Sequence, residues 1–241
     1  SFKGPDRGLV GAHHRCNGNE SGRLLRRGLS PVHAFAHPPG ALHATVTPVV
    51  QFANETVAPT RSARLIILDR DGVINHDSDL FIKTPDEWRP IPGSLEAIAR
   101  LSHAGYRVAV CTNQSGIGRG LFDMATLNAI HNRMHRALAL AGGRIDAVFF
   151  CPHTADARCE CRKPLPAMLI EAGRRFGADL ATVPCIGDSL RDLQAADAAG
   201  AQPMLVLTGK GEKTLRDGDF PASTAIYPDL AFAVSALLAQ D

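Results

Sequence analysis

From residue 64 onward, short apolar segments alternate with longer amphipathic segments. The short segments are typical of strands buried on both faces of a parallel sheet, and the longer ones have the 3.6-residue period of helices. We expect strands at 64–69, 107–112, 146–151, 183–187 and 203–207, and helices at 92–103, 123–141, 166–176, 189–199 and 229–239. Strands that alternate with helices favour right-handed crossovers and helices on both sheet faces. We therefore predict an α/β protein, a three-layer α/β/α sandwich with a mainly parallel, Rossmann-like sheet.

The first 62 residues have a different pattern. They are rich in Gly, Pro and His, and no apolar period of 2 or 3.6 continues through them. The basic stretch at 23–27 is followed by prolines and histidines instead of the continuous apolar segment of a secretory signal, and an organellar transit peptide remains an alternative. We expect a poorly ordered extension over residues 1–62 and a folded domain over residues 63–241.

Composition and charge exclude several classes of function. The 241 residues are 45% apolar and 21% charged, which is typical of a globular protein. The apolar segments are far shorter than the roughly 18 residues that a membrane span needs. The net charge is +2, and the excess of basic residues lies in the first 60 residues. We expect a protein that binds neither membranes nor nucleic acids, because the folded domain is almost neutral.

Chemically reactive side chains follow the predicted strands. Asp69 and Asp71 follow the first strand, Thr112 ends the second, Lys163 follows the third and Asp188 follows the fourth. Each motif alone is usually a turn or a helix cap, but the carboxyl ends of parallel strands meet at one edge, so these side chains should converge. Three carboxylates would repel one another, which indicates Mg²⁺ with oxygen ligands, and Mg²⁺ with a lysine suits a phosphate ester.

A second cluster lies after the third strand. Four soft or borderline metal ligands fall within eleven residues: Cys151, His153, Cys159 and Cys161. These are the ligand types and the number that tetrahedral Zn²⁺ takes in a structural site. A disulfide or free thiols are the alternatives, but no signal peptide indicates an oxidising compartment and a histidine has no role in a disulfide. We predict a structural zinc site that fixes the backbone of Arg162 and Lys163 for substrate.

In their order along the chain, these motifs resemble those of the haloacid dehalogenase (HAD) superfamily of aspartate-nucleophile phosphatases. The resemblance covers about residues 64–241. It implies that Asp69 attacks phosphorus to form an aspartyl-phosphate, and that Asp71 protonates the leaving alcohol and then activates water. It also implies that Mg²⁺ is held by Asp69, the backbone carbonyl of Asp71 and Asp188, while Thr112 and Lys163 complete the phosphate cradle.

Within the superfamily, the segments 69–75, 112–120 and 151–164 resemble those of sugar-bisphosphate phosphatases. The Gly-Arg-Gly at 118–120 separates them from the related histidinol-phosphate phosphatases, which remain the alternative. The resemblance implies a small phosphorylated sugar as substrate, and we expect a monomer in the cytoplasm. A binding protein on this fold should have lost Asp69 or Asp71, and both are present. The further candidates for substrate binding are Asn113, Gln114, Ser115, Arg119, Arg162, Ser189 and Asp77.

The spacing of the motifs leaves no room for an inserted cap domain, so we expect the loops 77–80, 116–120 and 151–162 to cover the site. His131 and His135, four residues apart on a predicted helix, lack the glutamate of a metalloprotease motif, and we predict that both lie on the helix surface. For Asp192, one turn beyond Asp188, a metal ligand and a surface or lysine-pairing carboxylate are equal alternatives.

Overall fold

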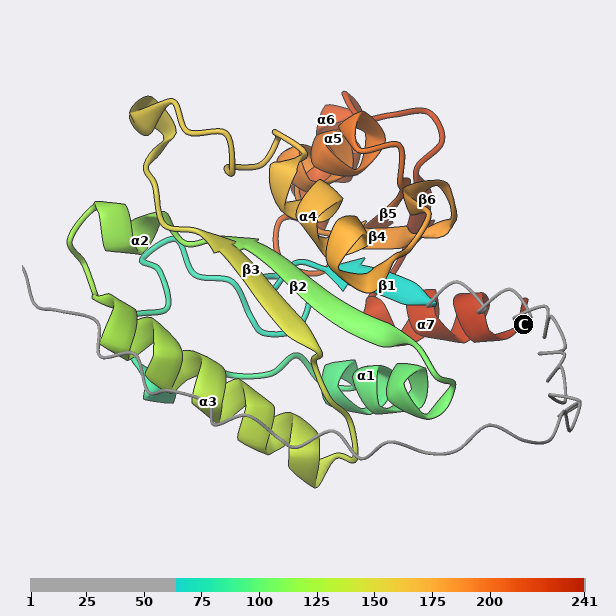
Figure 1. Ribbon diagram of the computed structural model, residues 1–241, viewed down its shortest axis with the longest axis horizontal. Helices are drawn as coiled ribbons and strands as arrows, with labels where there is room; N and C mark the ends of the chain where they lie inside the picture. Colours follow the sequence, from blue (N-terminus) through green and yellow to red (C-terminus); the bar gives the residue numbers. More distant parts are fainter. Residues whose placement is uncertain (1–63, 241) are drawn as a thin grey trace, which may run out of the picture. The chain divides into compact units, whose positions relative to one another are not determined.

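The computed structural model describes residues 64–240 (Figure 1). The extension predicted over residues 1–62 therefore lies outside the described residues. Among residues 64–240, the helices lack the length and the continuous apolar surface that a membrane span requires.

The residues of β1 (Leu65–Leu68) are all buried, but alternate ones belong to different apolar cores. Ile66 and Leu68 pack in the larger core, and Leu65 and Ile67 in the smaller one. Such a strand has no polar face because both sides of the sheet are covered. The larger core also contains residues of α1 (Ser94–His103), α3 (Met124–Leu140) and α7 (Leu230–Leu238), and the smaller one residues of α4 (Ala167–Phe176) and α5 (Leu190–Ala198).

Six strands form one parallel sheet in the order β3-β2-β1-β4-β5-β6. The other strands are β2 (Arg107–Asn113), β3 (Ala147–Cys151), β4 (Pro184–Gly187), β5 (Gln202–Val206) and β6 (Ala225–Tyr227). In Figure 1, α1, α3 and α7 lie on one side of the sheet and α4 and α5 on the other, which confirms the three-layer sandwich. The order of the strands reverses between β1 and β4, and ligands of open α/β sheets bind in the crevice at such a point.

The expected strands and helices are all present, and each end lies within two residues of the predicted one. Three elements were not predicted, namely β6, α2 (Ser115–Gly118) and α6 (Gly211–Asp217), because segments of three to seven residues carry little periodic signal. Short 3₁₀ turns lie at Pro85–Glu87, Ala155–Ala157 and Leu180–Thr182. Within residues 64–240 no further domain is inserted between the motifs, as predicted.

Helix α3 begins after Asp123 and carries His131 and His135, for which one prediction is confirmed and one is wrong. Asp123 is its N-cap, and the side chain accepts a hydrogen bond from the backbone N–H of Thr126 (2.8 Å). His135 is exposed, as predicted, but the prediction that His131 lies on the surface is wrong, because His131 is buried. Its Nε2 lies 3.3 Å from Nη1 of the buried Arg70, so the face of α3 that carries His131 packs toward the loop after β1.

Candidate active site

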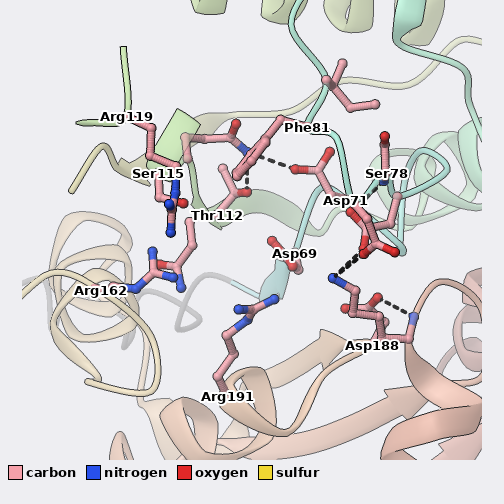
Figure 2. A pocket seen from close by; sticks show the side chains of 16 residues that line it. Asp69, Asp71, Ser78, Phe81, Thr112, Ser115, Arg119, Arg162, Asp188 and Arg191 are labelled. Atoms are coloured by element: carbon pink, nitrogen blue, oxygen red, sulfur yellow. Dashed lines mark hydrogen bonds and ion pairs between the residues drawn. The ribbon is translucent and has the colours of Figure 1, made fainter. Parts of the chain in front are cut away.

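A cavity of about 240 Å³ opens at the carboxyl ends of β1, β2 and β4 (Figure 2). Asp69 and Asp71 reach it from the end of β1, Thr112 from β2, and Asp188 from the end of β4. Four basic side chains also line the cavity: Arg119, Arg162, Arg191 and Lys210. The strand order thus brings together the predicted catalytic carboxylates, and the basic groups make the cavity suitable for an anion.

Lys163 and Asp69 form a buried ion pair. Lys163 Nζ lies 3.0 Å from Asp69 Oδ1 and 2.6 Å from Asp192 Oδ1, and it donates a hydrogen bond to the carbonyl of Cys111 (2.7 Å). Burial would lower the pKa of Lys163, but Asp192 and Asp69 outweigh burial and raise it, so the ammonium stays charged. Burial raises the pKa of Asp69 to about 6, with Lys163 opposing this shift and Asp192 and Asp71 adding to it.

Asp192 pairs with Lys163, which is one of the two roles predicted for it. Its other oxygen, Oδ2, accepts hydrogen bonds from the hydroxyl (2.5 Å) and the backbone N–H (3.0 Å) of Ser189. The Ser189 hydroxyl is therefore engaged at the start of α5, and Ser189 does not line the cavity. Asp192 fixes both the helix start and the lysine.

Asp71 lies beside Asp69 and is surrounded by donors from Arg70, Asn75 and Gln114. Burial would raise the pKa of the Asp71 carboxyl, but the Arg70 charge and the hydrogen bonds from Asn75 and Gln114 outweigh burial and lower it. The carboxylate is therefore ionised in the ligand-free site, and it can accept a proton.

Asp188 has features that fit a divalent cation. Burial raises its pKa to about 8, and repulsion from Asp192 and Asp69 adds to this shift. Carboxylate oxygens of these three residues lie within 4.8 Å of one another. Gly72 and Gly209 both have positive φ, and a Cβ on either would lie 2.0 or 2.2 Å from Asp188 Oδ2, so only glycine leaves space here. Crowded carboxylates of this kind are the hard oxygen donors that Mg²⁺ prefers.

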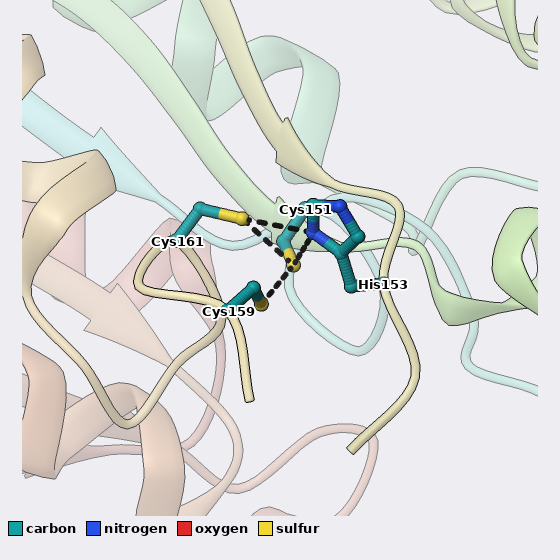
Figure 3. A group of neighbouring side chains, drawn as sticks. All are labelled: Cys151, His153, Cys159 and Cys161. Atoms are coloured by element: carbon teal, nitrogen blue, oxygen red, sulfur yellow. Dashed lines mark hydrogen bonds between the residues drawn. The ribbon is translucent and has the colours of Figure 1, made fainter. Parts of the chain in front are cut away.

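The four predicted zinc ligands lie together: Cys151 ends β3, and His153, Cys159 and Cys161 are in the loop that follows it (Figure 3). The Sγ atom of Cys151 lies 3.6 Å from His153 Nδ1, 3.6 Å from Cys159 Sγ and 3.1 Å from Cys161 Sγ. His153 Nδ1 lies 3.3 Å from Cys161 Sγ. These separations fit four donors around one ion with bonds of about 2.0 to 2.3 Å. The cysteines that the structure describes form no disulfide, so that alternative does not occur here.

The loop that carries His153, Cys159 and Cys161 is connected by hydrogen bonds to residues that line the cavity. Arg162 Nη1 donates a hydrogen bond to the carbonyl of His153 (3.2 Å). The Asn113 side chain donates to the carbonyl of Lys163 (3.1 Å) and accepts from its N–H (3.1 Å). Asn113 therefore positions the Lys163 backbone as well as lining the cavity.

The other predicted substrate-binding residues all line the cavity, but they differ in whether their side chains contact other residues of the site. Ser115, Arg119 and Asp77 line the cavity, and Asp77 also pairs with Lys210 at 3.1 Å. Gln114 lines the cavity too, but its amide contacts Asp71, Thr112 and Arg70. Arg191 and Lys210 were not predicted from the sequence as cavity residues, although each lies shortly after the end of a strand, where functional residues gather.

These features define a phosphatase of the HAD type: the Asp69 and Asp71 carboxylates after β1, the Lys163 ammonium, and the Thr112 hydroxyl on β2. A family model described as HAD-hydrolase-like matches residues 160–233. The D-glycero-beta-D-manno-heptose-1,7-bisphosphate 7-phosphatase of Bordetella bronchiseptica is 60% identical over 177 residues, 73% of this chain and 99% of that protein. The protein of the same name from Pseudomonas aeruginosa is 55% identical over 177 residues, with the same coverage of 73% and 99%.

Solved structures of heptose 1,7-bisphosphate phosphatases are also similar to this chain. The crystal structure of D,D-heptose 1,7-bisphosphate phosphatase from B. bronchiseptica, complexed with magnesium and phosphate, is 60% identical with a TM-score of 0.73, and covers 74% of this chain and 99% of that chain. The phosphatase of the same name from Burkholderia thailandensis is 56% identical with a TM-score of 0.60, and covers 73% and 98%. This chain belongs to the family of D-glycero-β-D-manno-heptose-1,7-bisphosphate 7-phosphatases within the HAD superfamily.

Proposed function

We propose that the protein hydrolyses the C7 phosphate of D-glycero-β-D-manno-heptose 1,7-bisphosphate, giving heptose 1-phosphate and inorganic phosphate. The observation that carries the proposal is one cavity lined by Asp69, Asp71 and three arginines. Lys163 does not line this cavity, but its ammonium is bound to Asp69 from the buried side (3.0 Å). The two carboxylates with Lys163 suit a reacting phosphate, and the arginines suit a second phosphate that does not react. The reaction would supply ADP-heptose synthesis for the lipopolysaccharide core, in the cytoplasm.

In the first half of the reaction, an Asp69 oxygen attacks the C7 phosphorus and the bond from phosphorus to the sugar oxygen breaks. The departing oxygen takes a proton from Asp71, so an aspartyl-phosphate and a neutral alcohol result. Asp71 is ionised in the free site, and the negative charge of the bound phosphate raises its pKa so that it can carry this proton. Lys163, 3.0 Å from Asp69, neutralises charge on the phosphoryl oxygens.

In the second half, Asp71 takes a proton from water while the water oxygen attacks the phosphorus. The bond between phosphorus and Asp69 then breaks, which releases inorganic phosphate and restores the Asp69 carboxylate. Thr112, whose hydroxyl accepts a hydrogen bond from Gln114 Nε2 (2.9 Å), lies where it can hold a phosphoryl oxygen. A neighbouring pair of carboxylates with different pKa values suits these two roles, one as nucleophile and one as proton carrier.

Two metal ions complete the proposal. Asp69, Asp188 and the backbone carbonyl of Asp71 would hold Mg²⁺, which supplies positive charge for the phosphoryl oxygens when bound. The cluster of three cysteines and His153 would hold Zn²⁺ as a structural ion that keeps Arg162 and Lys163 in place. We propose that the active form is a monomer.

The test is a comparison of phosphate release from heptose 1,7-bisphosphate and from histidinol phosphate with Mg²⁺ present. We expect a higher kcat/KM for the bisphosphate, since histidinol phosphate has no second phosphate for the arginines. A higher kcat/KM for histidinol phosphate would assign the protein to the related branch, and absence of release from both would contradict a phosphatase function.

A further inference from the structure

The Asp71 carboxylate is held by a closely spaced set of donors. Oδ1 accepts hydrogen bonds from Arg70 Nε (3.0 Å) and Nη2 (2.9 Å) and from Asn75 Nδ2 (2.9 Å). Oδ2 accepts from Arg70 Nη2 (2.9 Å) and from Gln114 Nε2 (2.9 Å). Because Arg70 binds both oxygens, the orientation of its guanidinium sets the plane in which the carboxylate lies.

The side chains that hold Asp71 are themselves held. Trp88 Nε1 donates a hydrogen bond to Asn75 Oδ1 (3.0 Å), and Arg70 Nη2 donates to Gln114 Oε1 (3.1 Å). Arg70 is 0% exposed, so each of its N–H groups that lacks an acceptor costs free energy. Its Nη1, which points away from Asp71, lies 3.3 Å from Nε2 of His131 on α3.

The imidazole of His131 must be the acceptor in this contact, because a guanidinium has only donors. Burial lowers the pKa of His131 to about 4, and the charges of Arg70 and His135 add to this shift. The ring is therefore neutral at neutral pH, with its proton on Nδ1 and a lone pair on Nε2. An acceptor on α3 thus fixes the end of Arg70 that is opposite to Asp71.

We infer that His131 is a positioning residue for the phosphatase reaction: it fixes the Arg70 guanidinium and, through Arg70, the direction in which the Asp71 carboxyl faces the leaving oxygen. This inference rests on the proposed function, in which Asp71 gives a proton to the leaving alcohol. A misplacement of about 1 Å can cost about 10²-fold in rate, so the effect should appear in proton transfer more than in binding.

Esters with different leaving groups separate this role from a general structural one. The value of kcat/KM reports the steps up to departure of the leaving group. An alkoxide needs a proton to depart, whereas p-nitrophenolate is stable without one. With the full chain and Mg²⁺, His131→Phe should lower kcat/KM about tenfold or more for glycerol 2-phosphate, but less than about threefold for p-nitrophenyl phosphate.

Two further variants control the experiment. In His131→Gln the side-chain oxygen can accept from Arg70, so kcat/KM should stay within about threefold of wild type for both esters. His135→Phe, on the exposed face of the same helix, should change neither value. If His131→Phe does not fold, His131→Met removes the acceptor with a more flexible side chain, and the same ratio of the two kcat/KM values is measured.

Three outcomes would overturn the inference: equal losses on both esters, no loss on either, or a Gln variant as selective as the apolar variant. Asp71→Asn, measured in parallel, distinguishes a failure of the proposed function from a failure of the inference about His131. If Asp71→Asn loses activity equally on both esters, the role of Asp71 in the proposed function is wrong. If Asp71→Asn is selective for the alkyl ester and the apolar His131 variant is not, the proposed function stands and His131 has no positioning role.

Discussion

At the residue scale, Asp69 has the position that a nucleophile requires. It follows the central strand β1, and its carboxylate lines the cavity and pairs with the buried Lys163. We predict that Asp69→Asn reduces kcat by more than about 10³-fold, because the amide has almost the same shape but no nucleophilic charge. The fold should remain, since burial and then the neighbouring carboxylates disfavour the Asp69 charge, and Lys163 keeps Asp192 as its ion-pair partner. Phosphate release and thermal unfolding are the two measurements, and wild-type release by a folded variant would contradict the mechanism.

Arg162 is the residue to test for the second phosphate. Its guanidinium lines the cavity, and one N–H is bound to the carbonyl of His153. An arginine binds phosphate oxygens in a bidentate fork, and removal of one partner of a buried charge pair costs about 2 to 4 kcal/mol. We predict that Arg162→Ala lowers kcat/KM for the heptose bisphosphate by tens-fold or more, with little change for a monophosphate ester.

The Arg162 experiment needs two controls. Arg136→Ala, on the exposed face of α3, should leave both activities unchanged. The zinc content of Arg162→Ala should equal that of the wild type. Equal losses on the bisphosphate and the monoester would instead assign Arg162 to the reacting phosphate, or, if zinc is lost, to the integrity of the loop.

At the element scale, Asp146 joins the starts of β2 and β3. Its carboxylate accepts hydrogen bonds from the backbone N–H of Val108 (2.9 Å), from Arg107 (2.9 Å) and from Arg144 (3.2 Å). Burial alone would raise the pKa of Asp146, but these bonds outweigh burial and lower it below the unperturbed 3.8. The ionised form is therefore the one that stabilises the pairing of the two strands.

This shift predicts a pH-dependent stability. A carboxyl whose pKa is lowered by folding contributes stability above its unfolded pKa and loses it as the pH falls through the folded value. Asp146→Asn should reduce the free energy of unfolding by about 1 kcal/mol at neutral pH, a modest value because both arginines are half exposed. In urea titrations the difference from wild type should be constant at neutral pH and shrink below about pH 4. Asp86→Asn, whose side chain is 94% exposed, is the control, and a difference that grows in acid would contradict the assignment.

At the scale of the whole molecule, we propose that residues 63–241 are sufficient for the reaction. The residues assigned to the two metal sites and the cavity all lie within 64–240, and the 177 residues aligned with the B. bronchiseptica relative make up 99% of that protein. A chain that lacks residues 1–62 should therefore keep kcat and KM within about twofold of the full chain. A large loss of kcat/KM in a folded, zinc-loaded truncation would show that the first 62 residues contribute to the site.

The sequence by itself determined five of the six strands, the strand-end motifs and the candidate metal ligands. These features depend on local patterns: apolar strands such as Leu65–Leu68 bury both faces, and parallel strands bring their carboxyl ends to one edge. For that reason Asp69, Asp71, Thr112 and Asp188 could be placed together before any distance was known. The four ligands of the predicted zinc site lie within eleven residues, so their proximity is local as well.

Only the tertiary structure decided which side chains hold the catalytic ones. From the sequence, His131 is predicted to lie on the surface, because the helix period alone does not say what packs against that face of α3. In the structure its Nε2 lies 3.3 Å from Nη1 of Arg70, which is 61 residues away in the chain. Gln114 has the position of a substrate ligand, but its amide contacts Asp71. Arg191 and Lys210 reach the cavity from α5 and from the loop after β5, through the packing of separate elements. A buried donor such as Arg70 needs an acceptor, but which residue supplies it depends on helix orientation, which is set by packing across the whole core.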